Sequence, residues 1–186
     1  MSLAKLSRIS AKRVMGIDAS TNSIAYCIFD GSNPVEYGEI NFEGSDVYKR
    51  ILDAKRKIRA LKSRFDVEFV VIEAAVMVRS ANTGLKMAYV FGAIMGELLE
   101  NGAKVVEVHP ITWQSFIGNK NFTTAQKAQV KKDNPSRSDN WIKAHIREMR
   151  KQKTLDFFAE LGIKTTSDNV ADAAGVAWYA IKNLVK

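Results

Sequence analysis

Residues 13–29 read RVMGIDASTNSIAYCIF, two apolar runs on either side of the polar residues 20–22. Short apolar runs joined by a few polar residues predict β-strands that pair as a hairpin. A third run of the same kind, at residues 35–41, follows a polar turn at residues 30–34. The start of the chain therefore predicts an antiparallel meander of three strands.

Downstream of this meander, helical and extended patterns alternate. Apolar side chains recur every three or four positions in residues 45–65, which predicts an amphipathic helix with a basic outer face. Further strands are expected at residues 68–73 and 104–109, and further helices at residues 82–100, 110–117, 151–161 and 169–185. This order predicts an α/β fold with a mixed five-stranded sheet and helices on both faces.

The chain is basic, and the excess charge is concentrated in one segment. Lys and Arg number 28 against 20 Asp and Glu, a net charge of +8, which favours a polyanionic partner and nucleic acid first. Residues 119–153 hold ten of the basic residues and three acids. We interpret residues 119–150 as a basic, loop-rich insertion with a helix at its end, within a single domain spanning residues 1–186.

Other features of the composition exclude several classes of protein. The single cysteine, Cys27, excludes a disulfide framework. No apolar stretch approaches the roughly 20 residues that a membrane-spanning helix needs. The basic first 13 residues lack the apolar core of a secretion signal. We therefore expect an intracellular, cytoplasmic protein without a membrane partner.

Three carboxylates lie in apolar surroundings, where an acid is costly unless it has a partner. Asp18 ends the first predicted strand, Glu73 ends the fourth, and Asp172 lies among small apolar residues of the last helix. Carboxylates that meet cannot all stay ionised without cations, and Mg²⁺ prefers oxygen ligands. Each acid alone could equally be a solvated strand or helix end. Asp168 is better explained as the N-cap of the last helix.

The residues around these acids resemble RuvC-type Holliday junction resolvases, within the RNase H-like nuclease superfamily. Three segments carry the resemblance in order, namely residues 14–29, 69–89 and 170–177, and residues 110–118 and 151–163 are similar to intervening family segments. Together they cover residues 13–185 except the basic insertion. The resemblance implies an RNase H-like fold and a homodimeric endodeoxyribonuclease of DNA recombination and repair. It also implies that Mg²⁺, or Mn²⁺ in its place, supports two-metal phosphodiester hydrolysis of branched DNA such as four-way junctions.

The resemblance also implies roles for individual residues. Asp18 would bridge the metals, Glu73 would ligate one of them, and Asp172 would complete the site. Where the family usually has a further acid, this chain has Asn169, whose amide oxygen can ligate a metal but brings no charge. Related nucleases tolerate a non-acid at this position. Alternatively, Asp168 substitutes for that acid by a shift of register, or the chain is an engineered inactive form. Lys153 falls where the family places a catalytically helpful lysine, although it could be a plain phosphate contact.

DNA contacts are expected from basic side chains and from one loop. The loop after Glu73, with Met77 and Val78, resembles the junction-contacting loop of the family. The predicted DNA-binding residues are Arg79, Lys86, Lys120, Lys127, Lys131, Lys132, Lys143 and Arg147. Trp113, Phe122 and Trp141 could stack on unpaired bases, but packing within the protein explains them better.

The predicted helix at residues 82–100 is apolar nearly all round, so we expect it to be buried on both sides. Gly84, Ala88, Gly92 and Gly96 recur every four residues and form a smooth face that permits close approach. That face either packs on the chain's own sheet or forms the twofold dimer interface that the resemblance implies.

Three other functions compete with a junction resolvase. An RNase H-like nuclease of RNA-processing or flap type would have the same fold and metals. A junction-binding protein could have lost its chemistry at Asn169. Residues 16–23 also resemble the phosphate loop of sugar kinases and actin-like ATPases, but those enzymes need two domains and a longer chain than 186 residues.

Overall fold

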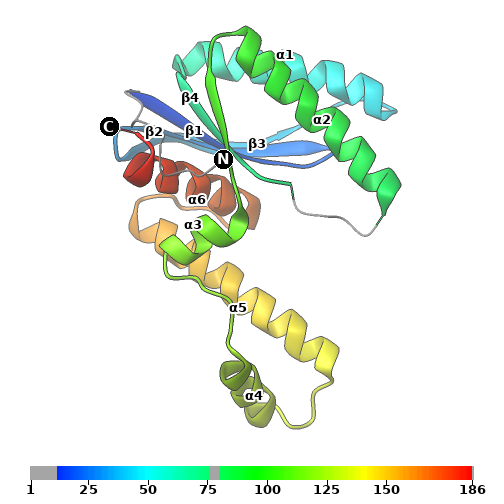
Figure 1. Ribbon diagram of the computed structural model, residues 1–186, viewed down its shortest axis with the longest axis vertical. Helices are drawn as coiled ribbons and strands as arrows, with labels where there is room; N and C mark the ends of the chain where they lie inside the picture. The colour runs from blue at the N-terminus through cyan, green and yellow to red at the C-terminus, as the bar shows by residue number, and fades with distance from the viewer. Residues whose placement is uncertain (1–11, 76–79, 186) are drawn as a thin grey trace.

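The computed structural model describes residues 12–75 and 80–185 and contains one mixed sheet (Figure 1). Its strands are β1 (Arg13–Ala19), β2 (Ser23–Asp30), β3 (Asn33–Asn41), β4 (Phe69–Glu73) and β5 (Lys104–Val108). They lie in the order β3-β2-β1-β4-β5. The first three strands pair antiparallel, whereas β4 is parallel to both β1 and β5. The predicted meander and mixed five-stranded sheet are therefore confirmed.

Helices cover both faces of this sheet, as the sequence predicts (Figure 1). One face packs against α1 (Val47–Phe65) and α2 (Ala81–Glu100) through side chains such as Met15, Ile17 and Ile72. The other face packs against α6 (Asp168–Asn183) and α3 (Pro110–Phe116) through Val14, Val71 and their neighbours. Because side chains of a strand alternate between faces, the apolar runs fill both layers at once.

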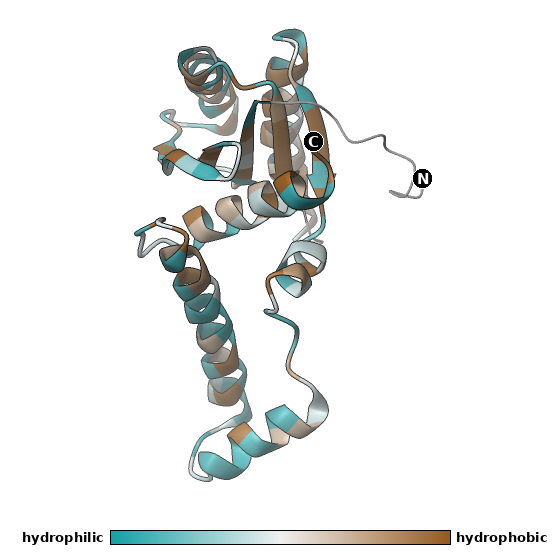
Figure 2. Cartoon of the chain, turned by 90° about the vertical axis from the view of Figure 1, so that its left-hand side faces the viewer, coloured by the Kyte–Doolittle hydropathy of each residue, from teal (hydrophilic) through white to brown (hydrophobic). Residues whose placement is uncertain are grey.

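The basic insertion differs from the loop-rich segment that the sequence predicts. It folds into α4 (Thr124–Asp133) and the first half of α5 (Asp139–Glu160), which together project from the sheet as an arm (Figures 1 and 2). Thr123 and Gln126 form a capping box that starts α4, and α5 runs without interruption to Glu160. No residue of α4 is buried. Without a buried apolar stripe, its sequence lacks the periodicity that predicts a helix.

Within one copy of the chain, helix α2 is buried on one side, and burial of its other side stays a prediction that concerns the pairing of two copies. Val90, Ile94 and Leu98 face the core, whereas Leu85, Tyr89 and Leu99 are 53%, 43% and 55% exposed. The glycine stripe does not pack on the chain's own sheet, because a Cβ on Gly92 or Gly96 would meet no atom within 4 Å.

No helix of the described residues is long and apolar enough to cross a membrane.

Candidate active site

Two of the three acids end adjacent parallel strands of the sheet. Ile17 of β1 lies opposite Ile72 of β4, and Asp18 and Glu73 come directly after that pair. Side chains alternate along a strand, so Asp18 shares its face with Val14 and Gly16, which is the face that α6 covers. The local strand pattern and its register therefore bring these two carboxylates to the same edge and face of the sheet.

Gly16 lets α6 lie directly on β1 and so brings the third acid to this place. A Cβ on Gly16 would lie 1.9 Å from the carbonyl oxygen of Ala173 and 2.9 Å from the Cβ of Ala177. No side chain fits in that space. Asp172 directly precedes Ala173, so the close approach of α6 carries its carboxylate toward Asp18.

Substituting Gly16 by alanine is expected to push α6 away from the sheet. Since the new Cβ would meet backbone rather than a flexible side chain, we expect the free energy of unfolding to fall by about 2–3 kcal/mol. Urea unfolding measures this loss. Gly38→Ala is the matched control, because a Cβ there would meet only Tyr26 atoms at 3.5–3.7 Å. Equal stability of the two variants would show that α6 does not lie this close to β1.

Trp113 of α3 holds Glu73 in place from inside the core. Its side chain is fully buried, and its Nε1 donates a 2.8 Å hydrogen bond to Oε2 of Glu73. The indole packs on Gly175 of α6, where a Cβ would lie only 2.3 Å from the ring. Packing within the protein, not stacking on bases, therefore explains Trp113, and this side chain links the strand acid to the helix that carries Asp172.

The pKa values of the three half-buried acids are all raised. Burial raises the pKa of Asp18 to about 6, with further contributions from Asp168 and Glu39. Burial and the neighbouring Asp18 raise the pKa of Glu73 to about 7, although the bond from Trp113 opposes this. The pKa of Asp172 rises to about 8 through burial, then through repulsion by Glu73 and Asp18. The three carboxylates are thus close enough to repel one another electrostatically.

The three carboxylates do not by themselves form a complete set of metal ligands. In the part of the chain that the structure describes, no three His, Cys, Asp or Glu side chains are gathered closely enough to hold an ion. The donors themselves suit a hard divalent cation, because all are carboxylate oxygens. Neither Asp18 nor Asp172 is engaged in a hydrogen bond or ion pair with any other described side chain. A divalent cation would therefore have to draw these carboxylates together.

The start of α6 differs from the sequence prediction by one residue. Ser167, not Asp168, is the N-cap, and its hydroxyl accepts from the Val170 backbone N–H and donates to the Glu39 carboxylate of β3. Asp168 instead pairs with Lys151 of α5, whose Nζ lies 2.7 Å from Oδ2. The hydrogen bond from Lys151 lowers the pKa of Asp168 below its usual value. The charge of Asp168 is therefore already neutralised by the side chain of Lys151.

A polar cavity of about 320 Å³ opens where α6 faces α5. Acids from β1 and α6 line one side of it, and Asn169 is exposed beside them. Basic residues of α5 line the other side. The acidic and amide residues are Asp18, Asp168, Asn169 and Asp172, and the basic ones are Arg147, Arg150 and Lys151.

Lys151, and not Lys153, is the lysine of α5 that lines the cavity of the acids. The Nζ of Lys153 donates to the carbonyl oxygen of Gly118 at 2.7 Å, and Lys153 does not line the cavity of the acids. Two helical residues separated by two positions point about 200° apart, so only one of them can face the acids. Sequence reasoning missed Lys151 and Arg150. The spacing of residues 147, 150, 151 and 154 on one helical face is the signal that indicates them.

Arg150 fixes the base of the arm against the rest of the chain. Its Nη2 donates to Oε1 of Gln114 at 2.6 Å and to the backbone oxygen of Asn119 at 3.2 Å. The amide of Asn119, itself buried, donates in turn to the Arg150 carbonyl oxygen and to Thr154. These reciprocal bonds join the end of α3 to the middle of α5, so they hold the basic side of the cavity in position.

The predicted DNA contacts fall into separate groups. Arg79, with Met77 and Val78, lies outside the described residues, and Lys86 is exposed on α2. The remaining residues are exposed on or next to the arm. They are Lys120 before α4, Lys127, Lys131 and Lys132 on α4, and Lys143 and Arg147 on α5. The arm thus gathers most of the predicted basic surface, and of these residues only Arg147 lines the cavity of the acids.

The mixed sheet, with acids ending its central strands and a helix across them, defines an RNase H-like α/β protein. The chain belongs to the family of the crossover junction endodeoxyribonuclease RuvC, whose family model matches residues 14–133. That match contains Asp18 and Glu73. Asn169 and Asp172 lie beyond it, and their place beside the other acids rests on the structure.

Solved structures share this fold. The chain is similar to Thermus thermophilus RuvC in complex with a Holliday junction substrate, at 16% identity and a TM-score of 0.65, covering 94% of this chain and 98% of that one. It is also similar to the yeast mitochondrial Holliday junction resolvase Ydc2, at 12% identity and a TM-score of 0.55, covering 95% and 82%. No curated protein sequence matches the chain.

Proposed function

We propose that this protein is a divalent-metal-dependent, structure-selective endonuclease that resolves branched DNA such as four-way junctions. The observation that carries the proposal is that Asp18 and Asp172 line one polar cavity with basic residues of α5, while Glu73 ends the strand next to Asp18. Membership of the RuvC family supports a junction as the substrate. A structure of one relative is described as a complex with a Holliday junction, which supports the same substrate.

Asp18, Glu73 and Asp172 are the residues that would hold Mg²⁺ or Mn²⁺, with the amide oxygen of Asn169 as a further neutral donor. When bound, such ions activate a water and stabilise the leaving oxygen of a phosphodiester. Trp113 orients Glu73 through its hydrogen bond, and Lys151 neutralises Asp168. Arg147 and Arg150 offer positive charge to the phosphates that enter the cavity.

Cleavage assays on a panel of substrates test this proposal. With Mg²⁺, we expect a synthetic four-way junction to be cut in preference to a matched duplex and to an RNA–DNA hybrid. Preferred cleavage of the hybrid or of a flap would favour an RNase H-like nuclease of other specificity. Tight junction binding without cleavage of any substrate would favour a junction-binding protein.

Asn169 is the observation that favours the binding protein as second candidate. It takes the place of a carboxylate at the mouth of the acid cavity, and Asp168 is occupied by Lys151. An Asn169→Asp variant distinguishes the two candidates. If the variant alone cleaves junctions, the present chain is an inactivated form. If both cleave, the amide is sufficient at this position.

The raised pKa values predict how stability depends on pH and Mg²⁺. The three acids bind protons more tightly in the folded chain than in the unfolded one, so stability is greatest below about pH 4 for these groups and falls as pH rises through about 6 to 8. Mg²⁺ removes the repulsion between ionised carboxylates. At saturating Mg²⁺ we expect the melting temperature to rise by roughly 5–10 °C at pH 8.5 and hardly at pH 5.

Thermal melts at both pH values, with Mg²⁺ or with a chelator, measure this effect. In Asp172→Asn the shift with Mg²⁺ should be lost, and without metal this variant should be more stable than the natural sequence at pH 8.5. Asp156→Asn, an exposed acid on α5, is the control and should keep the shift. A Mg²⁺ shift of equal size at both pH values would contradict binding by these acids.

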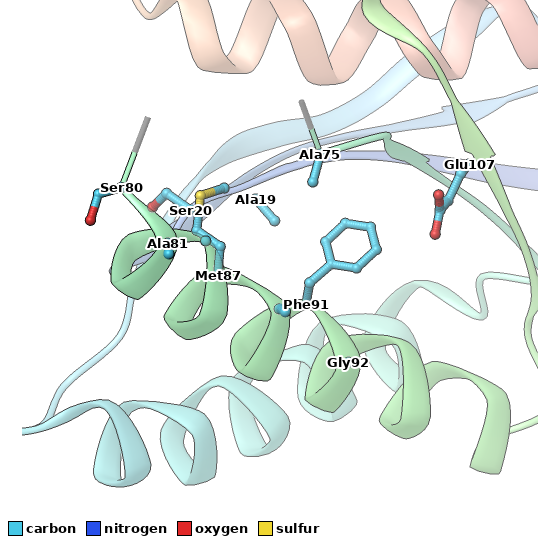
Figure 3. Close-up of a pocket in the computed structure, with 11 residues that line it drawn as sticks. Ala19, Ser20, Ala75, Ser80, Ala81, Met87, Phe91, Gly92 and Glu107 are labelled. Carbon is cyan, nitrogen blue, oxygen red and sulfur yellow. The ribbon is translucent and has the colours of Figure 1, made fainter. Parts of the chain in front are cut away.

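We also propose that two copies of the chain pair through α2. Its small residues border a groove of about 570 Å³ that Met87 and Phe91 also line, next to the ends of β1 and β4 (Figure 3). Exposed Leu85 and Tyr89 extend this apolar surface. The charge network of Glu97, which accepts from Arg59 of α1 at 2.5 and 3.0 Å, fixes α2 against α1. A rigid, open and apolar helix face of this kind suits a twofold helix contact.

Light scattering at micromolar concentration tests the pairing. We expect a dimer for the natural sequence and a monomer for Leu85→Glu. Leu52→Glu is the matched control, because Leu52 is also exposed, at 69%, but belongs to α1 and not to α2. Dimers that persist in Leu85→Glu, or are lost equally in both variants, would contradict an α2 interface.

A further inference from the structure

A second cavity, of about 590 Å³, lies within the arm between α4 and α5. Its volume is in the range of about 300–1,000 Å³ that small-molecule sites occupy. Phe122, Ala128, Ile142 and Ile146 give it an apolar lining. The sequence predicts phosphate contacts in this segment and explains Phe122 by packing within the protein. In the structure Phe122 is only half-buried, and its side chain lines this groove.

Positive charge surrounds this apolar lining. Lys127, Lys131 and Lys143 all lie at the groove, and its single acid, Asp139, pairs with Lys131 at 2.7 Å. Among the described residues, neither Lys127 nor Lys143 forms an ion pair. The occupant should therefore be anionic at its edge and flat or apolar at its centre. Duplex DNA presents only phosphates to such a groove, whereas an unpaired nucleotide also presents the face of its base.

The groove adjoins the acid cavity. Arg147 and Arg150 of α5 line both. A DNA strand whose phosphate lies at the acids would therefore have a neighbouring nucleotide within reach of the arm. The arginines provide continuous positive charge for the phosphates between the two places.

We infer that the groove between α4 and α5 binds one unpaired nucleotide of the strand that is cut, a few nucleotides from the scissile phosphate. The base packs on Phe122 and the isoleucines, and Lys127 and Lys143 contact its phosphates. This inference rests on the proposed function, because it places the strand by way of the acid cavity. It adds a reason for preferring branched DNA, whose bases near the branch leave the stack at lower cost than those of a duplex.

Binding measurements on a four-way junction test the inference. Single abasic sites are placed in turn at the nucleotides flanking the cleavage position, with Mg²⁺ present and Asp18→Asn used to prevent cleavage. At one of these positions, loss of the base should weaken binding by about fivefold or more, the expected worth of one stacked base. Ala128→Phe, which fills the groove without removing a charge, should weaken binding to the intact junction by a similar factor. It should then show no further loss with the abasic site.

Ala144→Phe is the matched control, because Ala144 is also an exposed alanine of the arm but does not line the groove. Its affinity and abasic profile should equal those of the parent. The dependence of affinity on salt should be unchanged in both variants, since every cation remains. If Ala128→Phe behaves like Ala144→Phe, or if no abasic position matters, the groove does not take a base. Cleavage of junctions by the natural sequence is a separate result, so the groove can fail while the nuclease proposal stands.

Discussion

Asp18→Asn is expected to reduce cleavage of a four-way junction by about a thousandfold or more, while junction affinity stays within a few-fold. The asparagine keeps the shape of the side chain and removes the charge of the acid that adjoins Glu73 at the end of the neighbouring strand. Metal affinity and the charge on the reacting phosphate depend on that carboxylate. The proposed DNA contacts lie mainly on the arm, which this change does not touch, so we expect affinity to be kept.

Stability separates this catalytic role from a structural one. Because burial raises the pKa of Asp18 to about 6, its ionised form costs stability at neutral pH. The neutral amide should therefore make the chain more stable at pH 8 in the absence of metal, even as activity disappears. Asp156→Asn, which changes the same charge on the exposed side of α5, should leave cleavage and melting temperature unchanged. A less stable Asp18→Asn with collapsed junction binding would identify a structural acid.

The sheet could be predicted from the sequence because each strand is a short apolar run bounded by turn residues. Asp18 and Glu73 could be singled out because each comes at the end of such a run, and these two runs are neighbours in the sheet. Both predictions rest on local patterns. The partners of these acids could not be predicted in this way. Trp113 reaches Glu73 across 40 positions of the chain, and Gly16 matters only because α6 crosses β1 there.

Helix α4 and the role of Lys151 were missed for a different reason. Helix α4 has no buried face, so its sequence carries capping residues but no apolar period. Which lysine of α5 faces the acids depends on how that helix is rotated on α6. The rotation follows from buried Thr154 and Phe158, which a prediction of the helix alone does not place. The N-cap of α6 lies one residue before the predicted one, because Ser167 and Asp168 are both capable of capping.

A second large effect, on junction affinity, is expected when basic residues of the arm are replaced. Replacing Lys131, Lys132, Lys143 and Arg147 together by glutamine should weaken junction binding by roughly two orders of magnitude. Each phosphate contact that is lost also removes a released counterion. The slope of log affinity against log salt concentration should therefore become shallower by about 3 to 4.

The control for this variant must change the net charge by the same amount elsewhere. Lys49, Lys62 and Arg64 on α1 and Lys104 at the start of β5 provide it. Helix α1 covers the face of the sheet opposite to the arm, and Lys104 belongs to the sheet itself (Figure 1). Replacing either set of four residues by glutamine lowers the formal net charge from +8 to +4.

If affinity followed net charge alone, both variants would lose affinity equally. If the arm binds the DNA, only the arm variant should lose affinity and show the shallower salt dependence. Its cleavage should recover at low salt, because Asp18, Glu73 and Asp172 remain intact. An unchanged slope in the arm variant would mean that the arm faces away from DNA, and the nucleotide groove between α4 and α5 would fail with it.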